Sequence, residues 1–385
     1  MDKNQVNSFD FIDLFAGIGG FHTAMHSIGG KCVFASEWDK NARKTYEATY
    51  EKIDKELFEK DEHGEYLYFN CDINDAKIDK IPDFEVLCGG FPCQAFSIAG
   101  KRKGFEDARG TLFFNIQKIV QYRIDLEKEN PNSGIKRPKV LFLENVKGLK
   151  NHDKGETLRV LKAILEDQLK YRVQIEVLNA KYFGVPQNRE RLFFVCWDPE
   201  QIKVDTFHFP YGLDKEGRPI FDKAELCRCV KTRLGDIFEP KDSILPKYTI
   251  SDRLWAGHQA RKERNKRSGK GFGYSLFTED SPYSSTISAR YYKDGSEILI
   301  DQSAEGKNPR KLTPVEAGRL QGYRIQGAGW AVEGMEEKID PNQPELVIDR
   351  VSNNEAYHQF GNSVAVPVIK TLAKEIQKQL LDKSE

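Results

Sequence analysis

The stretch from residue 9 to residue 28 constrains the fold of this chain most strongly. Residues 9–15 are mainly aromatic and β-branched residues of the kind that form a buried strand. A glycine-rich turn over residues 16–20 follows at once, and residues 21–28 then show a helical pattern of apolar side chains. A strand, a glycine turn and a helix in this order predict the start of an α/β sheet. Such a turn can hold a ligand at the carboxyl end of the strand, against the amino terminus of the helix.

The glycine turn alone is a weak signal, because a purely structural turn would look the same. Its spacing is not G-x-G-x-x-G, so the nicotinamide fingerprint is absent. Residues 31–36 predict a second strand that ends in Glu37-Trp38-Asp39. An acid here, about twenty residues past the glycines, can accept hydrogen bonds from ribose hydroxyls, and Trp38 can lie against a purine ring. Either acid can instead cap the helix predicted over residues 40–50; we expect Glu37 to bind ribose and Asp39 to be the cap.

A third short strand is predicted to end at residues 70–73. Asp72 can accept a hydrogen bond from an exocyclic amine, while Ile73 can pack on the face of a ring. An adenosine-type ligand needs these two contacts, although a turn aspartate is the alternative. Together with the acid after the second strand, they indicate an adenosine-bearing ligand whose binding motif is not a phosphate cradle.

The loop over residues 89–97 leaves a buried strand at residues 84–88 and carries Cys93 at its centre. A loop cysteine in this position is a candidate nucleophile. A buried structural thiol is an equally good interpretation of this stretch alone. The segment that follows, residues 98–110, is rich in lysine, arginine and glycine, which suits contact with a phosphate backbone or a solvated surface loop.

Residues 139–143 predict another buried strand, which ends in Glu144. A carboxylate at the end of a core strand is partly desolvated, which raises its pKa and lets it donate a proton. A helix cap is the alternative role. Arg189 and Arg191 alternate in an extended segment, so we expect them to share a face and hold a phosphate, a carboxylate or a base oxygen. A surface ion-pair ladder is the alternative for this pair.

The composition is that of an ordinary soluble globular protein. Lys plus Arg and Asp plus Glu both number 59, which excludes a uniformly basic nucleic-acid binder but not a local basic face. The seven cysteines are scattered without a C-x-x-C pair, which argues against a disulfide framework and a zinc site, so we expect no metal. The polar amino terminus and the lack of an apolar run near 20 residues predict a cytosolic protein without a membrane segment.

The second half of the chain differs in character after residue 197. Residues 261–270 are the densest basic run, followed by glycines and aromatics, which suits a nucleic-acid surface or a merely solvated face. Thr313, Pro314 and Glu316 predict a capped helix start. Residues 359–364 are expected to form a short polar turn. The apolar stripe over residues 366–380 then predicts a helix that docks back on the first sheet.

Several of these features occur together, in order, in one protein family. The chain resembles a bacterial DNA (cytosine-5)-methyltransferase of the restriction-modification type. The motifs that carry this resemblance are residues 13–20, Glu37-Trp38, Asp72-Ile73, residues 90–97, Glu144-Asn145-Val146, residues 187–191, the Leu312-Thr313-Pro314 helix start and Gly361-Asn362-Ser363-Val364. Each motif is weak alone, whereas the ordered set is specific. One departure is Cys71, which stands where the family usually has glycine; we expect it to leave cofactor binding intact.

The resemblance implies S-adenosyl-L-methionine as cofactor and an α/β, Rossmann-like fold with a smaller, mixed and irregular target-recognition domain. Residues 1–197 plus 352–385 would form the catalytic, cofactor-binding domain, and residues 198–351 the target-recognition domain and hinge. The thiolate of Cys93 would add to cytosine C6, and Glu144 would protonate N3 or form a hydrogen bond with it. Arg189 and Arg191 would hold O2 and support the loop. The implied cofactor-binding residues are Phe15, Ala16, Gly17, Gly19, Gly20, Glu37, Trp38, Asp72, Ile73, Pro92, Leu112, Asn362, Ser363 and Val364. The expected DNA-binding residues are Ser97, Lys101, Arg109, Lys270, Arg290 and Tyr291.

The segments 270–274 and 285–299 are similar to recognition segments of enzymes that act on CCGG or CCNGG sites, with Arg290 as the candidate for guanine readout. We expect a monomer that acts on double-stranded DNA in the bacterial cytoplasm, alongside an independent cognate restriction endonuclease if one exists. Three alternatives remain: a tRNA cytosine-5 methyltransferase, which the long basic segment disfavours; a catalytically inactive DNA-binding homologue; and a nucleotide-linked oxidoreductase.

Overall fold

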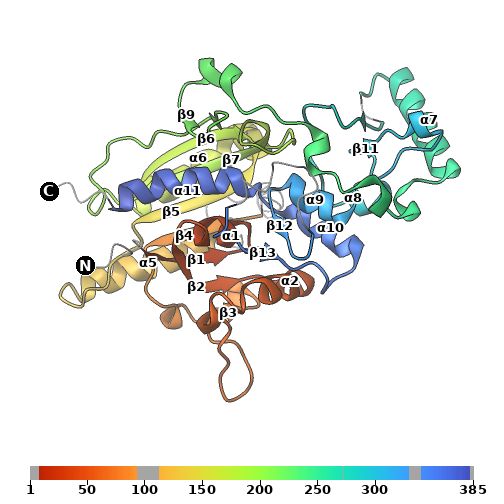
Figure 1. Cartoon of the computed structure of the whole chain (residues 1–385). Helices are drawn as coiled ribbons and strands as arrows, with labels where there is room; N and C mark the ends of the chain where they lie inside the picture. The colour runs from red at the N-terminus through yellow and green to blue at the C-terminus, as the bar shows by residue number, and fades with distance from the viewer. Residues whose placement is uncertain (1–7, 93–111, 272, 329–339, 382–385) are drawn as a thin grey trace.

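Hydrophobic strands from the first half of the chain build one sheet of seven strands in the computed structural model (Figure 1). The structure describes residues 8–92, 112–271, 273–328 and 340–381. The strand order is β3-β2-β1-β4-β5-β7-β6, and β7 is antiparallel to both of its neighbours while the pairs from β3 to β5 are parallel. The strands are β1 Phe9–Leu14, β2 Gly30–Ser36, β3 Phe69–Asn70, β4 Val86–Gly90, β5 Val140–Val146, β6 Arg172–Asn179 and β7 Glu190–Trp197.

Two apolar clusters pack on the two faces of this sheet, because successive side chains of a strand point to opposite sides. Phe11 of β1 belongs to the cluster under α1, α2 and α11, and the next residue, Ile12, belongs to the cluster under α5 and α6. The predicted α/β class is therefore confirmed. The covering helices are α1 Gly20–His26, α2 Lys40–Tyr50, α5 Phe113–Glu129, α6 Glu156–Ala163 and α11 Val366–Leu381.

The predicted return of the last helix to the first unit is also confirmed. Helix α11 packs against α1, and the Gln377 side chain donates a hydrogen bond of 2.8 Å to the carbonyl of Ile28. Its apolar stripe, which includes Val366, Ile369 and Leu372, is fully buried in the first cluster. The beginning and the end of the described chain thus share one hydrophobic core.

The residues between β7 and α11 form short elements separated by irregular chain, and each of the strands has two residues. Short strand pairs alternate with helices, and much of the segment lies at the right of Figure 1. Among the described residues its elements include β8 Gly212–Leu213, β9 Pro219–Ile220, α7 Asp252–Arg267, β10 Leu276–Phe277, α8 Tyr291–Asp294, β11 Leu299–Ile300, α9 Pro314–Leu320, β12 Arg324–Ile325, β13 Glu345–Leu346 and α10 Asn353–Asn362. The division into two domains remains a prediction.

The structure adds a helix that the sequence analysis did not predict, and it differs from one prediction in this segment. The basic run near residue 265 belongs to helix α7, which begins after the cap residue Ser251. The predicted polar turn at residues 359–364 is instead largely the end of helix α10. Gly361 does not break that helix: a Cβ there would lie 2.1 Å from the backbone nitrogen of Ala289, so glycine allows close packing.

The predicted cap of α9 is confirmed. The Thr313 hydroxyl accepts from the Glu316 amide, and the Glu316 carboxylate accepts from the Thr313 amide, with Pro314 in the first turn. The same carboxylate forms a buried ion pair of 2.7 Å with Arg310. Among the described residues, no helix is both long and apolar enough to cross a membrane.

Candidate active site

The glycine turn after β1 is held in a conformation that requires its glycines. Gly17 and Gly19 have φ values of 57° and 82°, and Phe15 between the strand and the turn also has a positive φ of 57°. A Cβ on Gly19 would lie 2.4 Å from the Tyr50 ring of α2. A Cβ on Gly17 would meet no heavy atom within 4 Å, so the turn is open on that side. The predicted strand, turn and helix are confirmed, and the turn leaves space for a ligand over Gly17.

The C-terminal motif lies directly against this turn. A Cβ on Gly20 would lie 2.4 Å from the side chain of Val364. The Ser363 hydroxyl forms a 2.7 Å hydrogen bond with the hydroxyl of Tyr323. Asn362 ends α10 with an exposed side chain. Residues more than 300 positions apart in the sequence are therefore neighbours here, which the sequence alone indicates only through the family resemblance.

Glu37 at the end of β2 is hydrogen-bonded to the glycine turn. Its carboxylate accepts from the Gly17 amide at 2.7 Å and from the Asp39 amide at 2.7 Å. Burial raises its pKa above the ordinary value, and these two amides counteract that effect. Asp39 accepts from two amides in the first turn of α2, so its predicted role as helix cap is confirmed. Ribose binding by Glu37 stays a prediction.

The ends of the first three strands meet at one edge of the sheet. The Ala16 amide donates to Ser36, and the Glu37 amide donates to Asn70, at 3.0 and 3.1 Å. This brings the glycine turn and the acid after β2 beside the end of β3. Residues that the sequence places tens of positions apart therefore surround one location.

The side chains at this edge differ in their exposure. Trp38 is 78% exposed, which leaves its ring free to stack on a ligand. Ile73 is buried, and the Asp72 carboxylate accepts from the backbone and side-chain amides of Asn74. Asp72 thus makes the local turn contacts named as the alternative, and contact with an exocyclic amine remains a prediction.

Asp13 of β1 is a buried carboxyl group beneath the turn. Among the described residues, neither of its oxygens has a hydrogen-bond partner. Burial raises the pKa of Asp13 well above its ordinary value, and the nearby His22 amide in the first turn of α1 lowers it only in part. The group is therefore neutral over a wider pH range than an exposed aspartate.

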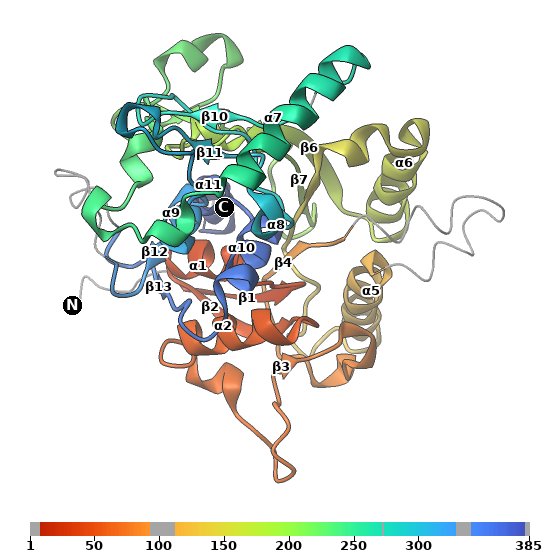
Figure 2. The same ribbon diagram turned by 90° about the vertical axis from the view of Figure 1, so that its right-hand side faces the viewer.

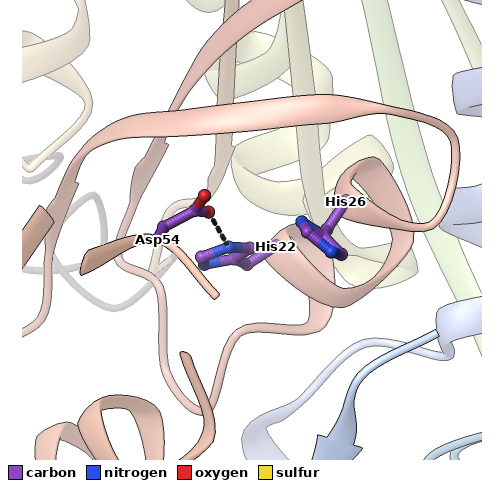
Figure 3. Close-up of side chains that lie close together, drawn as sticks. All are labelled: His22, His26 and Asp54. Carbon is purple, nitrogen blue, oxygen red and sulfur yellow. Dashed lines mark hydrogen bonds and ion pairs between the residues drawn. The ribbon is translucent and has the colours of Figure 1, made fainter. Parts of the chain in front are cut away.

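A network of polar side chains supports α1 next to the turn. The His22 ring stacks on Tyr50 with centroids 3.8 Å apart, and its two nitrogens lie 2.8 Å from Tyr46 and Asp54. Figure 3 shows the contact between His22 and Asp54, with His26 nearby. Burial lowers the pKa of His22, which favours a neutral ring that donates to Asp54 and accepts from Tyr46. His26 completes a group whose ligand atoms lie within 4.8 Å of one another. Because both His22 nitrogens already have protein partners, we interpret the group as structural.

Glu144 lies at the carboxyl end of β5, next to the beginning of the cysteine loop. It pairs in register with Gly90 of β4, and its carboxylate is 3.0 Å from the guanidinium of Arg191. Burial raises its pKa, while the charges of Arg191 and Arg189 act in the opposite direction. The sequence-based expectation of a buried carboxyl group with a raised pKa at this strand end is therefore supported.

The stem of the cysteine loop is anchored beside Glu144. The Asn145 side chain donates a 2.7 Å hydrogen bond to the carbonyl of Phe91, whose ring is buried. Sequence reasoning did not assign Asn145 this role, although it noted the motif. Pro92 is the last described residue before the loop, and Leu112 resumes the chain at the cap position of α5. The predicted residues Cys93, Ser97, Lys101 and Arg109 lie outside the described residues.

The two arginines near β7 have different surroundings. Arg189 is fully buried, and its terminal nitrogens donate to the carbonyl oxygens of Ile287, Gly361 and Ser363. Arg189 therefore connects the chain just before β7 to the segment around Ile287 and to the end of α10. Arg191 instead faces Glu144. The charges of both arginines act on Glu144, but their partners differ, because only Arg191 forms the ion pair and Arg189 donates to carbonyl groups.

The predicted DNA-binding residues that the structure describes also differ. Lys270 and Arg290 are exposed, as surface contacts require. Tyr291 is fully buried, and its hydroxyl donates to the carbonyl of Ile298 and accepts from the Leu312 amide. The prediction that Tyr291 contacts DNA is wrong, because these contacts fix it inside the protein.

The sheet order, with its single antiparallel strand, and the glycine turn beside an exposed aromatic define a Rossmann-like domain for a nucleoside ligand. The family model described as C-5 cytosine-specific DNA methylase matches residues 9–378. The chain therefore belongs to the C-5 cytosine-specific DNA methylase family and is a DNA (cytosine-5)-methyltransferase. Members of this family take their methyl group from S-adenosylmethionine.

Relatives of the chain match it over nearly its full length. The Type II methyltransferase M.SsoII of Shigella sonnei is 46% identical over 97% of this chain and 81% of its own length. M.NlaX of Neisseria lactamica is 44% identical over 97% of both chains. M.HpaII of Haemophilus parainfluenzae is 38% identical over 98% of this chain and 92% of its own. The predicted resemblance to bacterial methyltransferases of the restriction-modification type is thereby confirmed.

Solved structures show the same fold at lower identity. DNMT2 of Spodoptera frugiperda, solved as a triple mutant, has a TM-score of 0.63 and 18% identity, and the match covers 96% of this chain and 99% of that chain. The Dnmt2 methyltransferase of S. pombe has a TM-score of 0.62 and 16% identity, over 97% and 98% of the two chains. These likenesses support the Rossmann-like fold class alone.

The observed site fits S-adenosylmethionine. The positive φ and the open space at Gly17 give a cradle that a Cβ would begin to fill, and the exposed ring of Trp38 offers a stacking surface. The Glu37 carboxylate lies at the same strand edge with lone pairs beyond its two amide contacts. These residues suit a nucleoside with a planar base.

Proposed function

We propose that this chain methylates C5 of a flipped-out cytosine within a specific short site of double-stranded DNA, through a covalent bond between Cys93 and C6. The observation that carries this proposal is the position of Glu144. Its buried carboxyl group, with a raised pKa, lies beside Gly90 and the anchored stem that leads to Cys93. The described stem that leads to the proposed nucleophile therefore begins beside the proposed proton donor, which supports addition to a pyrimidine ring.

The chemistry begins with the Cys93 thiolate. Its sulfur forms a bond to cytosine C6, while Glu144 gives a proton to N3 and offsets the negative charge that develops on the ring. C5 becomes enamine-like and nucleophilic as a result. S-adenosylmethionine supplies an electrophilic methyl group when bound. Loss of the C5 proton to a base and β-elimination of the Cys93 sulfur, with return of the N3 proton to Glu144, then release 5-methylcytosine and the free thiolate.

The remaining polar groups support these steps. An ordinary cysteine has a pKa of about 8.5, so nearby cationic groups favour the thiolate at neutral pH. Arg191 lies 3.0 Å from Glu144 and is the better placed arginine for contact with cytosine O2. Arg189 serves as a positioning residue, because its terminal nitrogens already donate to three carbonyl oxygens.

The target base must leave the DNA stack before it can reach this site. Flipping costs a few kcal/mol, which contacts to the DNA backbone offset. The exposed side chains of Lys270 and Arg290 favour such contacts. Arg290 is also our candidate for guanine readout in a CCGG or CCNGG site, because arginine pairs with guanine through two hydrogen bonds. Methylome sequencing of a host that expresses the chain tests this; a consensus without neighbouring C·G pairs would contradict it.

The mechanism predicts that Cys93→Ala abolishes methyl transfer and leaves DNA binding intact. Without the thiolate, C5 is too weak a nucleophile to react. Methyl transfer from labelled cofactor and gel-shift titration with the same duplex measure the two properties. Duplex containing 5-fluorocytosine should trap the wild-type protein covalently and leave the variant unbound after denaturation. Full activity of the variant would refute the adduct, and transfer to tRNA instead of DNA would refute the substrate.

We further propose that the protein acts as a monomer in the bacterial cytoplasm, associated with the nucleoid through DNA. Any cognate restriction endonuclease would be a separate protein that acts on the same site. Sedimentation of the protein with one duplex per chain tests the stoichiometry, and a two-to-one complex would contradict it.

A further inference from the structure

Helix α7 presents three arginines on one exposed face. At 3.6 residues per turn, Arg253, Arg264 and Arg267 lie within about 60° of one another around the helix axis. All three side chains are exposed. The residues between them on this face are Gly257 and Ala260, which are small and also exposed. The face is therefore a strip of small residues with one arginine near the start of the helix and two arginines near its end.

Contacts on the sides of α7 next to the strip fix its orientation. His258 is buried and lies 3.2 Å from the carbonyl of Asp294, and Arg261 forms a 3.0 Å ion pair with the carboxylate of the same residue. Arg261 also donates to the carbonyl of Gly273. Because these contacts hold the inner face, the arginine strip points in a defined direction away from the body of the protein.

The guanidinium groups of these three arginines form no ion pair and no hydrogen bond with the part of the chain that the structure describes. Two acids of the same helix flank the strip near Arg267: Glu263 lies about 40° and Asp252 about 60° from it around the axis. The three arginines outnumber these two acids, so the strip keeps a positive charge beside a surface smooth enough for close approach by a large anion.

The dimensions of the strip fit a DNA duplex. Arg253 and Arg264 are 11 residues apart, or about 16 Å along the axis at 1.5 Å per residue. A major groove is about 12 Å wide, so long side chains at the two ends can reach phosphates on both of its sides. Lysine and arginine contacts to phosphate are the sequence-independent part of DNA binding.

The position of α7 separates it from the reacting base. The proposed target-recognition segment, residues 198–351, contacts the chain just before β7 of the seven-stranded sheet, where Gln187 forms a bridge with Ser284. Helix α7 lies at the outer end of that segment, far from β4 and β5 (Figures 1 and 2). We propose that its arginine face binds the DNA phosphate backbone that flanks the recognition site. This inference rests on the proposed function, because it takes double-stranded DNA as the substrate.

The test replaces the three residues together, as Arg253→Gln, Arg264→Gln and Arg267→Gln, since glutamine keeps the helix propensity and removes the charge. The matched control is Lys52→Gln, Lys55→Gln and Lys128→Gln. These three lysines are exposed. Lys52 and Lys55 follow the end of α2, and Lys128 lies in the last turn of α5, so all three lie at the carboxyl ends of helices whose amino ends face the candidate active site. Circular dichroism and thermal melting establish that both triple variants fold.

The measurement is the slope of log K against log salt concentration for two duplexes with the same site, about 12 and about 40 base pairs long. Each lost phosphate contact lowers the magnitude of the slope by about 1, so the arginine variant should lose about 3 on the long duplex and none on the short one. Methylation at saturating DNA and the preference for the site should remain those of the wild type, and the control should match the wild type throughout.

Three results would overturn the inference: an unchanged slope on the long duplex, an equal loss on both duplexes, or an equal loss in the lysine control. Failure of the proposed function would look different, because the wild-type protein would then not methylate either duplex. A wild type that methylates DNA together with an unchanged slope in the arginine variant rejects only the role of α7.

Discussion

Glu144 is subject to two opposing influences at the residue scale. Burial raises its pKa, whereas the positive charges of Arg191 and Arg189 lower it, and burial dominates. A carboxyl group in this state can hold a proton at a higher pH than an exposed glutamate and still release it to a base nitrogen. The buried strand end that the sequence predicts is the cause, and the nearby arginine limits the shift.

Replacing this group separates proton transfer from simple hydrogen bonding. Glu144→Gln can donate a hydrogen bond to N3 but cannot transfer a proton, so we expect the rate of methyl transfer to fall by about 10²–10⁴-fold. In the wild type the protonated form is lost as pH rises through the raised pKa, and the variant should lack this decrease. Single-turnover rates across pH, with DNA and cofactor saturating, measure both. A variant with the wild-type pH profile would argue against Glu144 as the acid.

Asp13 gives a pH dependence of stability with a definite sign. Its folded-state pKa is raised, so the folded state favours the protonated form. That contribution to stability is fully present below the unfolded pKa of about 3.9 and is lost as pH rises through the folded pKa. Asp13→Asn carries no such charge, so its stability relative to the wild type should increase as pH rises over that range. Denaturant titrations at several pH values test this; parallel curves for the two proteins would contradict it.

At the scale of the element, two separate factors require glycine in the turn after β1: a positive φ angle and close contact with a neighbouring side chain. Gly17 and Gly19 both have positive φ, but only Gly19 faces a side chain, the Tyr50 ring. The left-handed conformation costs a non-glycine residue about 1–2 kcal/mol. A forced steric overlap in a packed interior typically adds about 1–3 kcal/mol.

These two costs predict different outcomes for two similar substitutions. Gly19→Ala should lower the free energy of unfolding by about 2–5 kcal/mol, because it meets both penalties. Gly17→Ala should lower it by only about 1–2 kcal/mol, while weakening cofactor binding through the methyl group it adds to the open side. Chemical denaturation and calorimetric titration of the cofactor provide the comparison. Equal losses of stability would show that the Tyr50 contact is unimportant.

Elements with a clear local signal could be predicted from the sequence. The apolar runs that became β1, β4 and β5 are buried by packing on both faces, and the caps at Asp39 and Thr313 satisfy amides of their own helices. Helix α7 could not be found in this way, because its buried face is made by His258 and Arg261 rather than by an apolar stripe. These two side chains contact Asp294 and Gly273, which lie on later segments of the chain.

Contacts between distant segments were also beyond sequence reasoning at the site. Tyr291 lies beside exposed charged residues in the sequence, yet it is buried because Ile298 and Leu312 bind its hydroxyl. Arg189 and Arg191 have the same residue type and similar sequence surroundings. Their roles diverge because carbonyl groups nearly 100 or more residues away meet only the first of them. Tertiary structure, rather than local pattern, decides both cases.

At the scale of the whole molecule, the proposed target-recognition segment is in close backbone contact with α10. A Cβ on Gly361 would lie 2.1 Å from the amide nitrogen of Ala289, whose neighbour Arg290 is our candidate for base readout. The rigid distance between these two backbones therefore sets the position of the readout residue relative to the catalytic sheet.

Gly361→Ala should disturb this arrangement more than the chemistry. We expect a loss of about 1–3 kcal/mol in stability and weaker discrimination between the specific site and other DNA, because the segment that carries Arg290 must shift. Gly148→Ala is the matched control, since its Cβ would meet no heavy atom within 4 Å. Melting temperatures and competition binding with site-free duplex measure the two effects. Unchanged discrimination would show that the spacing between these backbones does not control recognition.

The packing of α11 against α1 has a consequence for protein synthesis. The first helix of the described chain has apolar surface that the last helix covers, and about 340 residues separate the two. At a translation rate of about 5–20 residues per second, that surface waits roughly 20–70 seconds on the ribosome for its partner. The nascent chain must therefore remain soluble with an incomplete core for most of its synthesis, which makes it a natural client for chaperones that shield exposed hydrophobic surface.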